Sequence, residues 1–452
     1  MEKFDVVVIG GGPAGLDAGF RLVKAGKKVC IINKRKDHLG GVCLNFGCMP
    51  TKSFLKTASV YRSVKKAGTF GLSAEVAPVD LSKVKASVEE IIGKLRMRIG
   101  VMCENAGATF KFGMGSFNSA NEVLITKDDG STEIVYGEKI IIAAGSSSRD
   151  LPFAPFDGEV ILNSDMMLIN TKLPEKLLII GGGAIGCEFA TMYNTFGSKV
   201  KLVEAMNQLI PNDDADAAMM IKERFESDGI DVLTSAMVES IEKVDGKAVV
   251  RFKGSDSPET FDMVLVSVGR APNVKELRLE NAGVDVEKGA VKVDEFLRTS
   301  NENIFAAGDS IGGWMFAHSA AYEGEVCAAN VLEYGSMELD ERAVPRVVFS
   351  NPEMGSVGIV KSADNIKELY IPELMKGRPA TDKTPVGLLK LFIYEDSDQI
   401  VGGVIVGDCA TEIVHELVMA VQNRLTVKQL KETIHAHPTF AEPLQYLAMS
   451  GL

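Results

Sequence analysis

The sequence predicts an α/β protein in which two parallel-sheet units share one glycine-rich pattern and a C-terminal α+β region follows them. Three observations predict this. An apolar strand runs into closely spaced glycines near the N-terminus, the same arrangement returns in the middle of the chain, and the region from about Val344 mixes strands and helices without it. With 452 residues the chain is longer than one hydrophobic core supports, so several domains are expected.

Composition narrows the class of protein. A net charge of −12 argues against a nucleic-acid partner, which would require a basic patch. The first residues run directly into the strand-like Val6–Ile9, so we expect no targeting peptide. No apolar run reaches the ~18 residues that would predict a membrane span. We therefore expect a cytoplasmic protein whose seven cysteines are normally reduced.

The first glycine-rich turn lies between two predicted strands. Gly10, Gly12 and Gly15 follow the first strand, a helix runs to about Lys24, and the second strand ends at Asn33. These glycines have the spacing of a dinucleotide-binding turn, where they allow a tight bend, close approach of a pyrophosphate and close packing of helix on strand. An acid is expected at the end of the second strand. Asn33 replaces it and can still make one hydrogen bond to a ribose hydroxyl.

The second glycine-rich turn repeats the first. Gly181, Gly183 and Gly186 follow the strand Leu177–Ile180, and the next strand ends at Glu204. A carboxylate here accepts hydrogen bonds from the adenosine ribose of NAD and repels the additional phosphate of NADP. The four residues after Glu204 contain no arginine that could neutralise that phosphate. The pattern therefore favours NAD.

Two cysteines lie close together in the segment 40–52. Cys43 and Cys48 on a regular helix would have Cα atoms roughly 8 to 9 Å apart, beyond the ~7 Å that a disulfide can bridge. A bond between them requires a distorted turn. Gly47 permits unusual backbone angles, and Pro50 suits the first turn of the helix that follows. The segment therefore predicts a redox-active pair.

Other interpretations of the pair are a structural disulfide, a zinc site, or two buried thiols. Cytosolic disulfides are usually catalytic or redox-sensing, which disfavours the first. Zinc requires four ligands with paired spacing, and we expect no metal site because the remaining cysteines are isolated in the sequence. They are Cys30, Cys103, Cys187, Cys327 and Cys409.

Several further segments are candidates for cofactor contact. A helix is predicted over 82–105, and a strand-rich stretch after it ends in small residues at Gly145. A similar strand ends at Gly269. A short apolar strand then ends at Asp309, a suitable place for an acid to meet a ribityl or phosphate group, and a helix rich in small residues begins at about Ala317.

The C-terminal region ends in a histidine and an acid separated by four residues, His437 and Glu442. A dithiol centre needs a proton acceptor that works near pH 7, and histidine is the natural one. An exposed loop followed by an ordinary short tail is the alternative. The predicted strands here are 347–349, 388–394 and 400–406, and the predicted helices are 412–422 and 427–433.

Taken together, these motifs resemble the pyridine nucleotide-disulfide oxidoreductases, and within them most closely the dihydrolipoamide dehydrogenase group. The resemblance covers essentially the whole chain. It is carried by the cysteine segment 40–52, both glycine-rich turns, Gly308-Asp309, Ala317-His318 with Glu323-Gly324, and the C-terminal segment 435–442.

The resemblance implies a fold with two Rossmann-like dinucleotide-binding domains and a C-terminal α+β dimerisation domain. FAD would bind to residues 1–150 and 271–341, NAD to residues 151–270, and residues 342–452 would form a homodimer. The expected partner is a lipoyl-bearing protein of a 2-oxoacid dehydrogenase or glycine-cleavage complex.

The resemblance also implies the reaction, which is oxidation of protein-bound dihydrolipoamide with reduction of NAD⁺. His437, held by Glu442, would take a proton from the substrate, and the thiolate would attack Cys43. Cys48 would face the flavin. Lys52 and Glu188 match the family's ion pair beside the flavin.

This chain departs from the family pattern at Val42, Asn33 and Ala144, all on the FAD side. We expect slightly looser FAD binding from these changes. Two other functions compete with the main interpretation: an NADH-dependent reductase of another small disulfide, and a non-catalytic scaffold subunit of a 2-oxoacid dehydrogenase complex.

Overall fold

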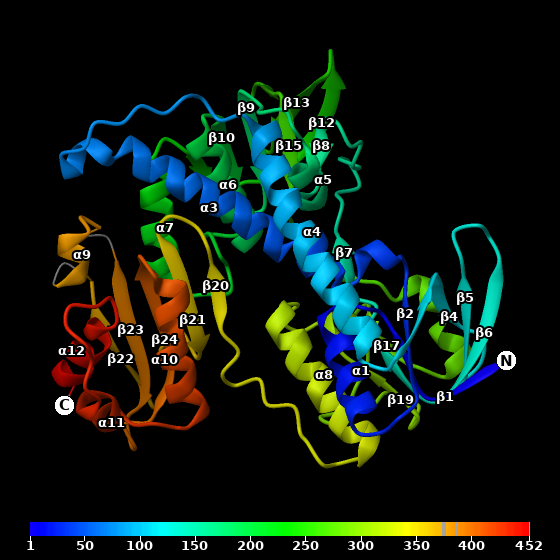
Figure 1. The fold of residues 1–452 in the computed structure, drawn as a ribbon. Coiled ribbons are helices and arrows are strands. Elements are labelled where there is room, and N and C mark those ends of the chain that lie inside the picture. The colour runs from blue at the N-terminus through cyan, green and yellow to red at the C-terminus, as the bar shows by residue number, and fades with distance from the viewer. Residues whose placement is uncertain (373–376, 385–386, 452) are drawn as a thin grey trace. The chain divides into compact units, whose positions relative to one another are not determined.

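The computed structural model describes residues 1–372, 377–384 and 387–451 (Figure 1). Contacts divide the chain into two units. The first unit comprises residues 1–53, 82–149 and 269–340, and the second comprises residues 54–81, 150–268 and 341–452.

The first unit is built on one sheet with the strand order β3-β2-β1-β6-β5-β4. Strand β6 pairs in parallel with β1 and, through its last three residues, with β19, while its first half pairs antiparallel with β5. The strands are β1 (Glu2–Ile9), β2 (Val29–Asn33), β3 (Thr109–Phe112), β4 (Met114–Phe117), β5 (Glu122–Thr126), β6 (Thr132–Ile142) and β19 (Ile304–Ala306).

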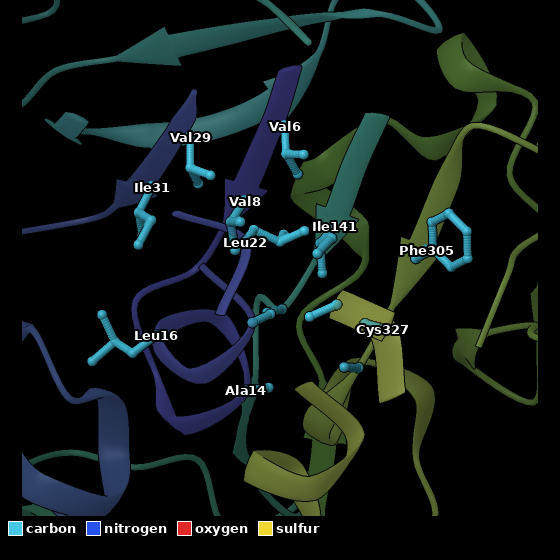
Figure 2. Packing of buried hydrophobic residues seen from close by; sticks show 14 of the residues in the cluster. Val6, Val8, Ala14, Leu16, Leu22, Val29, Ile31, Ile141, Phe305 and Cys327 are labelled. Carbon is cyan, nitrogen blue, oxygen red and sulfur yellow. The ribbon is translucent and has the colours of Figure 1, made fainter. Parts of the chain in front are cut away.

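Helices α1 and α8 pack against this sheet and against each other. Figure 2 shows the core between them, where Leu22 of α1 and Cys327 of α8 meet Val8 of β1 and Phe305 of β19. A Cβ at Gly324 would lie 2.4 Å from the carbonyl oxygen of Ala14, so only glycine allows α8 to approach α1 this closely. The helices of the unit include α1 (Pro13–Lys24), α4 (Leu81–Asn105) and α8 (Ala317–Leu332).

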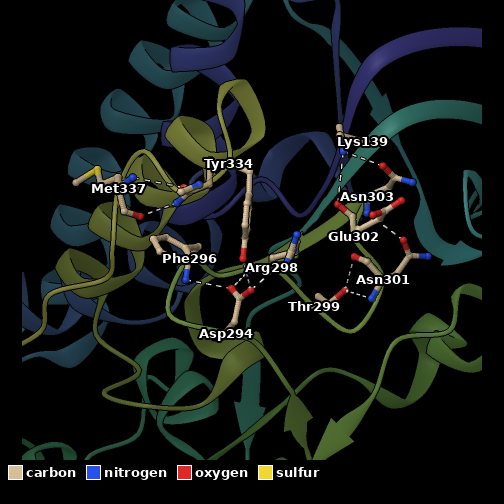
Figure 3. Close-up of polar contacts among 12 residues, drawn as sticks. Lys139, Asp294, Phe296, Arg298, Thr299, Asn301, Glu302, Asn303, Tyr334 and Met337 are labelled. Atoms are coloured by element: carbon tan, nitrogen blue, oxygen red, sulfur yellow. Dashed lines mark hydrogen bonds and ion pairs between the residues drawn. The ribbon is translucent and has the colours of Figure 1, made fainter.

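Polar contacts fix the segment that precedes β19 in the chain (Figure 3). The Asp294 carboxylate accepts hydrogen bonds from the Arg298 backbone N–H at 2.9 Å and the Tyr334 hydroxyl at 2.8 Å. Lys139 of β6 donates to the Asn303 side chain at 2.7 Å. These bonds fix the residues that enter β19, and β19 leads directly to Asp309.

The remaining short elements of the first unit lie in the loops. They are η1 (Lys36–His38), η3 (Lys275–Leu277), η4 (Leu279–Ala282), η5 (Gly308–Ile311), β7 (Ser146–Ser148), β16 (Arg270–Pro272), β17 (Val286–Glu287) and β18 (Ala290–Val291). Strands β7 and β16 pair antiparallel.

The second unit contains a parallel sheet with the order β11-β10-β9-β15-β8 and a small antiparallel sheet β12-β13-β14. Its strands are β8 (Ile161–Leu162), β9 (Lys176–Ile180), β10 (Lys199–Val203), β11 (Asp231–Leu233), β12 (Val238–Val244), β13 (Lys247–Phe252), β14 (Glu259–Phe261) and β15 (Met263–Val266). The helices are η2 (Ala67–Phe70), α5 (Ser164–Ile169), α6 (Ala184–Phe196) and α7 (Ala215–Ser227).

The C-terminal part of the second unit is an antiparallel sheet with the order β20-β21-β24-β23-β22, packed on α10. Its elements are β20 (Arg346–Val348), β21 (Glu353–Gly358), β22 (Ile366–Ile371), α9 (Arg378–Thr381), β23 (Leu388–Tyr394), β24 (Ile400–Gly407), α10 (Ala410–Gln422), α11 (Val427–Glu432) and α12 (Glu442–Ser450). An ordinary short tail after Glu442 belonged to the alternative interpretation of this segment, and the structure does not have it. The tail is helix α12, and Leu444, Leu447 and Ala448 bury its inner face.

Candidate active site

The first glycine-rich turn has two glycines that the backbone requires and one that it does not. A Cβ at Gly10, where φ is +123°, would lie 1.9 Å from the Ala143 carbonyl oxygen, and a Cβ at Gly15 would lie 1.9 Å from that of Gly10. At Gly12 the nearest atom to a Cβ would be 3.9 Å away. The backbone N–H groups of α1 begin at Gly12 without a side-chain cap. The space that a side chain would fill therefore lies in front of a helix N-terminus, where a phosphate binds favourably.

The second turn has the same construction. A Cβ at Gly181 or Gly186 would overlap a carbonyl oxygen, at 2.4 and 1.9 Å, whereas a Cβ at Gly183 would meet nothing within 4 Å. Helix α6 begins there, again without a side-chain cap. The middle glycine of each turn thus has no explanation within the protein, and a bound pyrophosphate supplies one.

The polar residues that end the second strand of each βαβ unit also correspond. Asn33 accepts a hydrogen bond from the Gly11 N–H at 3.0 Å, and Glu204 accepts one from the Gly182 N–H at 2.7 Å. The second Glu204 oxygen accepts from the Met206 N–H at 2.8 Å. Each side chain therefore braces its glycine turn, and only Glu204 adds a negative charge.

Asp309 follows β19 in the first unit and is bound to two neighbouring segments. The Ser146 hydroxyl donates a short hydrogen bond to Asp309. Arg270 in turn donates to the Ser146 hydroxyl at 2.7 Å and to its carbonyl oxygen at 2.8 Å. Gly145 and Gly269, which precede these residues, both have positive φ, at +71° and +107°, in open surroundings. Two sequence-predicted strand ends thus lie beside the predicted acid.

Glu323 of α8 is a buried residue to which sequence reasoning gave no specific role. It accepts hydrogen bonds from the Gly308 N–H at 2.5 Å and from the Ser319 hydroxyl at 2.7 Å. Helix α8 begins at the predicted Ala317. Glu323 therefore ties this helix to the turn that presents Asp309.

The cysteine segment forms two helices with a break between them. Cys43 lies in the one-turn helix α2 (Gly41–Asn45), and Cys48 begins α3 (Cys48–Lys65). Pro50 lies in the first turn of α3, as predicted. The expectation about Gly47 needs correction, because its φ is not positive. A Cβ at Gly47 would lie 3.1 Å from the Val42 carbonyl oxygen, a tight contact that glycine avoids.

The positive φ angles lie at the start of the segment, at Gly40 and Gly41, with values of +88° and +66°. A Cβ at Gly41 would lie 2.8 Å from the Cα of Gly12, and the Gly40 N–H donates to the Gly11 carbonyl oxygen at 2.9 Å. The cysteine segment therefore packs directly against the first glycine-rich turn.

Cys43 and Cys48 are half-buried thiols in the structure. The hydrogen bond between Cys43 and Cys48, together with burial, raises the pKa of the Cys43 thiol, while the charge of Lys52 opposes that rise. The two sulfurs are thus close enough to share a proton. Oxidation of such a pair to a disulfide requires no unfolding.

His437 and Glu442 form a hydrogen-bonded couple in the second unit. His437 Nδ1 lies 2.8 Å from Glu442 Oε1. The His437 side chain is 72% exposed, whereas that of Glu442 is 6% exposed. Glu442 also accepts from the Thr439 N–H and the Tyr446 hydroxyl, each at 2.8 Å. The hydrogen bonds from His437 and Thr439 lower the pKa of Glu442 to about 2, which keeps it ionised. The proton on Nδ1 then leaves Nε2 as the accepting nitrogen.

A second histidine–glutamate pair lies beside this couple and was missed in the sequence. His435 Nε2 is 2.9 Å from Glu416 Oε2, and His435 Nδ1 is 3.0 Å from the Thr433 carbonyl oxygen. Glu416 belongs to α10, far from His435 in the sequence, so no local pattern indicated the contact. The pair anchors the start of the segment that carries His437.

Lys52 and Glu188, the remaining predicted pair, lie on different helices. Lys52 lies on α3, one turn after Cys48. Glu188 lies on α6, is 4% exposed, and accepts a hydrogen bond from the Phe349 N–H at 3.2 Å. The first unit thus holds the cysteines, Lys52 and the first turn. The second holds Glu188, Glu204 and the histidine couple.

Neither a metal site nor a membrane-spanning helix occurs among the described residues. No three His, Cys, Asp or Glu side chains within residues 1–372, 377–384 and 387–451 converge to hold a metal ion. In that same part of the chain, no helix has the length and apolar character to cross a membrane.

Residues 4–324 match the pyridine nucleotide-disulphide oxidoreductase family, and residues 344–448 match its dimerisation domain. This chain belongs to that family. Curated relatives include dihydrolipoyl dehydrogenases from Bacillus subtilis and Chlamydia trachomatis, which are 34% and 35% identical to this chain. The alignments cover 99% and 98% of this chain and 98% and 95% of the respective relatives.

Solved structures of the family have the same fold. LpdA from Mycobacterium tuberculosis superposes with a TM-score of 0.91 at 26% identity over the whole of both chains. The HOCl-induced flavoprotein disulfide reductase RclA from Escherichia coli superposes with a TM-score of 0.87 at 27% identity, covering 98% of this chain and 99% of that one.

The chain is therefore an oxidoreductase of this family, with FAD and NAD as its cofactors. Its residues fit these molecules. The spaces at Gly12 and Gly183 lie before helix N-termini without side-chain caps, and each leaves room for a pyrophosphate where a side chain would intrude.

Proposed function

We propose that this chain oxidises protein-bound dihydrolipoamide to lipoamide and reduces NAD⁺ to NADH, as a dihydrolipoyl dehydrogenase. One observation carries the proposal. The hydrogen-bonded pair Cys43 and Cys48 lies against the first glycine-rich turn, in a chain aligned over 98% or more of its length with relatives of that name.

The first step is proton removal from the substrate dithiol. His437 is suited to this step for two reasons. Glu442 accepts a hydrogen bond from the Nδ1–H of its ring, and the imidazole is largely exposed. Nε2 then accepts the thiol proton. The ionised Glu442 stabilises the imidazolium that results.

The second step is thiol–disulfide exchange with the oxidised pair. The substrate thiolate attacks the sulfur of Cys43, the bond between Cys43 and Cys48 breaks, and Cys48 leaves as a thiolate. The second substrate thiol then attacks the mixed disulfide and releases Cys43. The substrate leaves as a cyclic disulfide, and both cysteines are reduced.

Turnover requires that the electron pair leaves the dithiol. FAD, held at the first glycine-rich turn, would supply the two-electron acceptor, and NAD⁺, held at the second, would supply the hydride acceptor. The chain's own residues shape the path. The charge of Lys52 lowers the pKa of Cys43 and so favours its thiolate form. Buried Glu188 lies on the helix that begins at the second glycine-rich turn.

The assignment of cofactors to domains follows from the two turns. Residues 1–150 and 271–341 bind FAD through Gly10, Gly12, Gly15, Asn33 and Asp309, with Gly145, Gly269 and Ala317 beside them. Residues 151–270 bind NAD through Gly181, Gly183, Gly186 and Glu204. The buried carboxylate of Glu204 excludes a 2′-phosphate, and none of the four residues that follow it is an arginine.

Residues 342–452 form a homodimer through the dimerisation domain, and His437 and Glu442 act in the active site of the partner subunit. The macromolecular substrate is the lipoyl-bearing protein of a 2-oxoacid dehydrogenase or glycine-cleavage complex. The proposed setting is the cytoplasm.

Initial rates of the FAD-loaded protein test this function. We expect fast NAD⁺ reduction by dihydrolipoamide, slow reduction of glutathione disulfide with NADH or NADPH, and loss of the dihydrolipoamide reaction in Cys48→Ser. If dihydrolipoamide is inert while another disulfide turns over, the substrate assignment is wrong and a general disulfide reductase takes its place.

A further inference from the structure

Asn45, one of the four residues between the two cysteines, is buried and makes several hydrogen bonds. Its side chain is part of α2, and the residue is 6% exposed. The amide nitrogen donates to the carbonyl oxygens of Leu39 at 3.1 Å and Gly41 at 2.8 Å. The amide oxygen accepts from Nε of Arg96 on α4 at 2.7 Å. Every polar atom of this amide is therefore engaged.

The chemistry of the three partners fixes the orientation of the amide. A guanidinium group only donates, and backbone carbonyl oxygens only accept. The oxygen of Asn45 must therefore face Arg96, and its nitrogen must face Leu39 and Gly41. A bond from a charged donor to a buried neutral acceptor is also stronger than a bond between neutral groups. The contact with Arg96 is consequently the one that holds this amide in place.

Helix α2 needs such support because it has five residues. A helix this short forms one turn and is unstable without external contacts. Asn45 ties the last residue of α2 to its first residue and to the preceding loop, and Cys43 lies between these points. The position of the Cys43 sulfur therefore depends on the orientation of the Asn45 amide.

We propose that Arg96 is a positioning residue for the dithiol: through Asn45 it fixes α2, and with it the Cys43 sulfur, at bonding distance from Cys48. The effect on turnover rests on the proposed function. The effect on the cysteine pair does not, because it concerns only the geometry of this chain.

Arg96 also forms an ion pair with Glu89, a residue outside the cysteine segment. Nη1 of Arg96 lies 2.6 Å from Glu89 on the same helix, and the Glu89 side chain is 61% exposed. Exposed ion pairs of this kind contribute little to stability. Glu89→Gln therefore provides the matched control, since it removes the ion pair and leaves the bond from Arg96 to Asn45.

The first test measures how readily the pair closes. The holoenzyme is equilibrated in a glutathione buffer, where two cysteine thiols and one glutathione disulfide give the protein disulfide and two glutathione thiols. Free Cys43 and Cys48 are then trapped by alkylation and counted by mass spectrometry. A preorganised pair has a high effective concentration. We expect Arg96→Met to lower the equilibrium constant for closure about tenfold, or about 30 mV for this two-electron couple.

The second test separates the dithiol from the flavin. Oxidation of NADH by ferricyanide needs the flavin but not the cysteine pair, whereas oxidation of dihydrolipoamide needs both. We expect Arg96→Met to slow the dihydrolipoamide reaction roughly tenfold and to leave the ferricyanide reaction and FAD content unchanged. Arg96→Lys should recover part of the loss, and Glu89→Gln should match the wild type in both tests.

The outcomes distinguish this proposal from the proposed function. If wild-type protein does not oxidise dihydrolipoamide but Arg96→Met still shifts the closure equilibrium, the substrate is wrong and the positioning role holds. An unchanged closure equilibrium in Arg96→Met overturns the positioning role. Should that variant lose FAD, Asn45→Ala is measured instead, and a wild-type closure equilibrium in Asn45→Ala also overturns the proposal.

Discussion

Glu442 accepts a hydrogen bond from His437 Nδ1 at 2.8 Å although the two side chains differ widely in exposure, at 6% and 72%. The acid is the first residue of α12 and also accepts hydrogen bonds from the Thr439 N–H, which precedes the helix, and from the Tyr446 hydroxyl one turn further on. The histidine extends outward from it. The couple thus combines a fixed acid with a base that a substrate thiol can reach.

Glu442→Gln tests this couple. An amide can place its N–H toward Nδ1 and favour the wrong tautomer, so we expect kcat for dihydrolipoamide to fall on the order of 10²-fold. Ferricyanide reduction by NADH should stay unchanged, because it does not need the base. Glu432→Gln on α11 is the matched control, since Glu432 is exposed and paired only loosely with Lys428 at 3.9 Å. Equal turnover in both variants would contradict the role of Glu442.

The same couple sets a pH dependence. The pKa of Glu442 is lowered from 4.5 to about 2, so its ionised form is favoured in the folded state. The stabilisation that it provides is complete above pH 4.5 and disappears as the pH falls from about 4.5 to about 2. Acid unfolding of the wild type should therefore show a contribution in this window that Glu442→Gln lacks. Parallel acid titrations of the two proteins by circular dichroism measure the difference.

The two kinds of glycine in the second turn predict opposite effects of alanine. In Gly183→Ala the new Cβ meets no protein atom within 4 Å, so we expect unchanged stability and a KM for NAD⁺ raised roughly tenfold by intrusion on the pyrophosphate. In Gly186→Ala the Cβ would lie 1.9 Å from the Gly181 carbonyl oxygen, and a loss of about 1–3 kcal/mol in stability is expected. Thermal unfolding and NAD⁺ titration of both variants separate the effects.

The spacing within each turn was predictable because part of its cause is local. Gly15 and Gly186 each avoid the carbonyl oxygen of the glycine five positions earlier, at 1.9 Å, and such a constraint leaves a fixed spacing in the sequence. Gly10 and Gly181 instead avoid carbonyl oxygens of distant segments. The cysteine segment was predictable for a similar reason. Its distorted turn was expected, although the positive φ angles fall at Gly40 and Gly41 and not at Gly47.

The contacts that sequence reasoning missed join distant segments. Arg96 reaches Asn45 across 51 positions, and Glu416 reaches His435 across 19. No periodicity relates such pairs, because their proximity arises only when the helices pack. Helix α12 was missed for another reason. It is short, and its apolar residues are buried only because the helix packs into the core of the C-terminal region.

Asn33→Glu tests the expectation of slightly looser FAD binding. Asn33 accepts a hydrogen bond from the Gly11 N–H at 3.0 Å, and Glu204 accepts the corresponding bond from the Gly182 N–H at 2.7 Å. Glutamate should therefore fit at position 33 and add a carboxylate for the ribose. One additional hydrogen bond is worth about 0.5–1.5 kcal/mol, which corresponds to a Kd for FAD lowered roughly two- to tenfold. Asn33→Gln controls for side-chain length. An unchanged Kd for FAD in Asn33→Glu would contradict this expectation.

The C-terminal sheet contains a buried lysine surrounded by acids. Lys390 of β23 lies 3.0 Å from Asp214, 2.6 Å from Asp216 and 3.3 Å from Glu368, and its side chain is 4% exposed. Burial lowers the pKa of Lys390, but the hydrogen bonds that Lys390 donates to Asp216 and Asp214 outweigh burial and raise the pKa overall. The lysine is therefore charged at neutral pH, and Asp214, which also caps α7 through the Ala217 N–H at 2.9 Å, depends on it.

Lys390→Met should be strongly destabilising for this reason. Methionine fills a similar volume but leaves the buried Asp214 without its cation, and breaking a buried pair by removing one partner costs about 3–5 kcal/mol. Lys428→Met is the control, because Lys428 is 72% exposed and an exposed pair is worth at most about 1 kcal/mol. Urea unfolding of the FAD-loaded proteins measures both changes. Asp214→Asn in the Lys390→Met background should recover part of the loss, since it removes the unpaired charge. A Lys390→Met variant as stable as Lys428→Met would show that water, and not Lys390, solvates these acids.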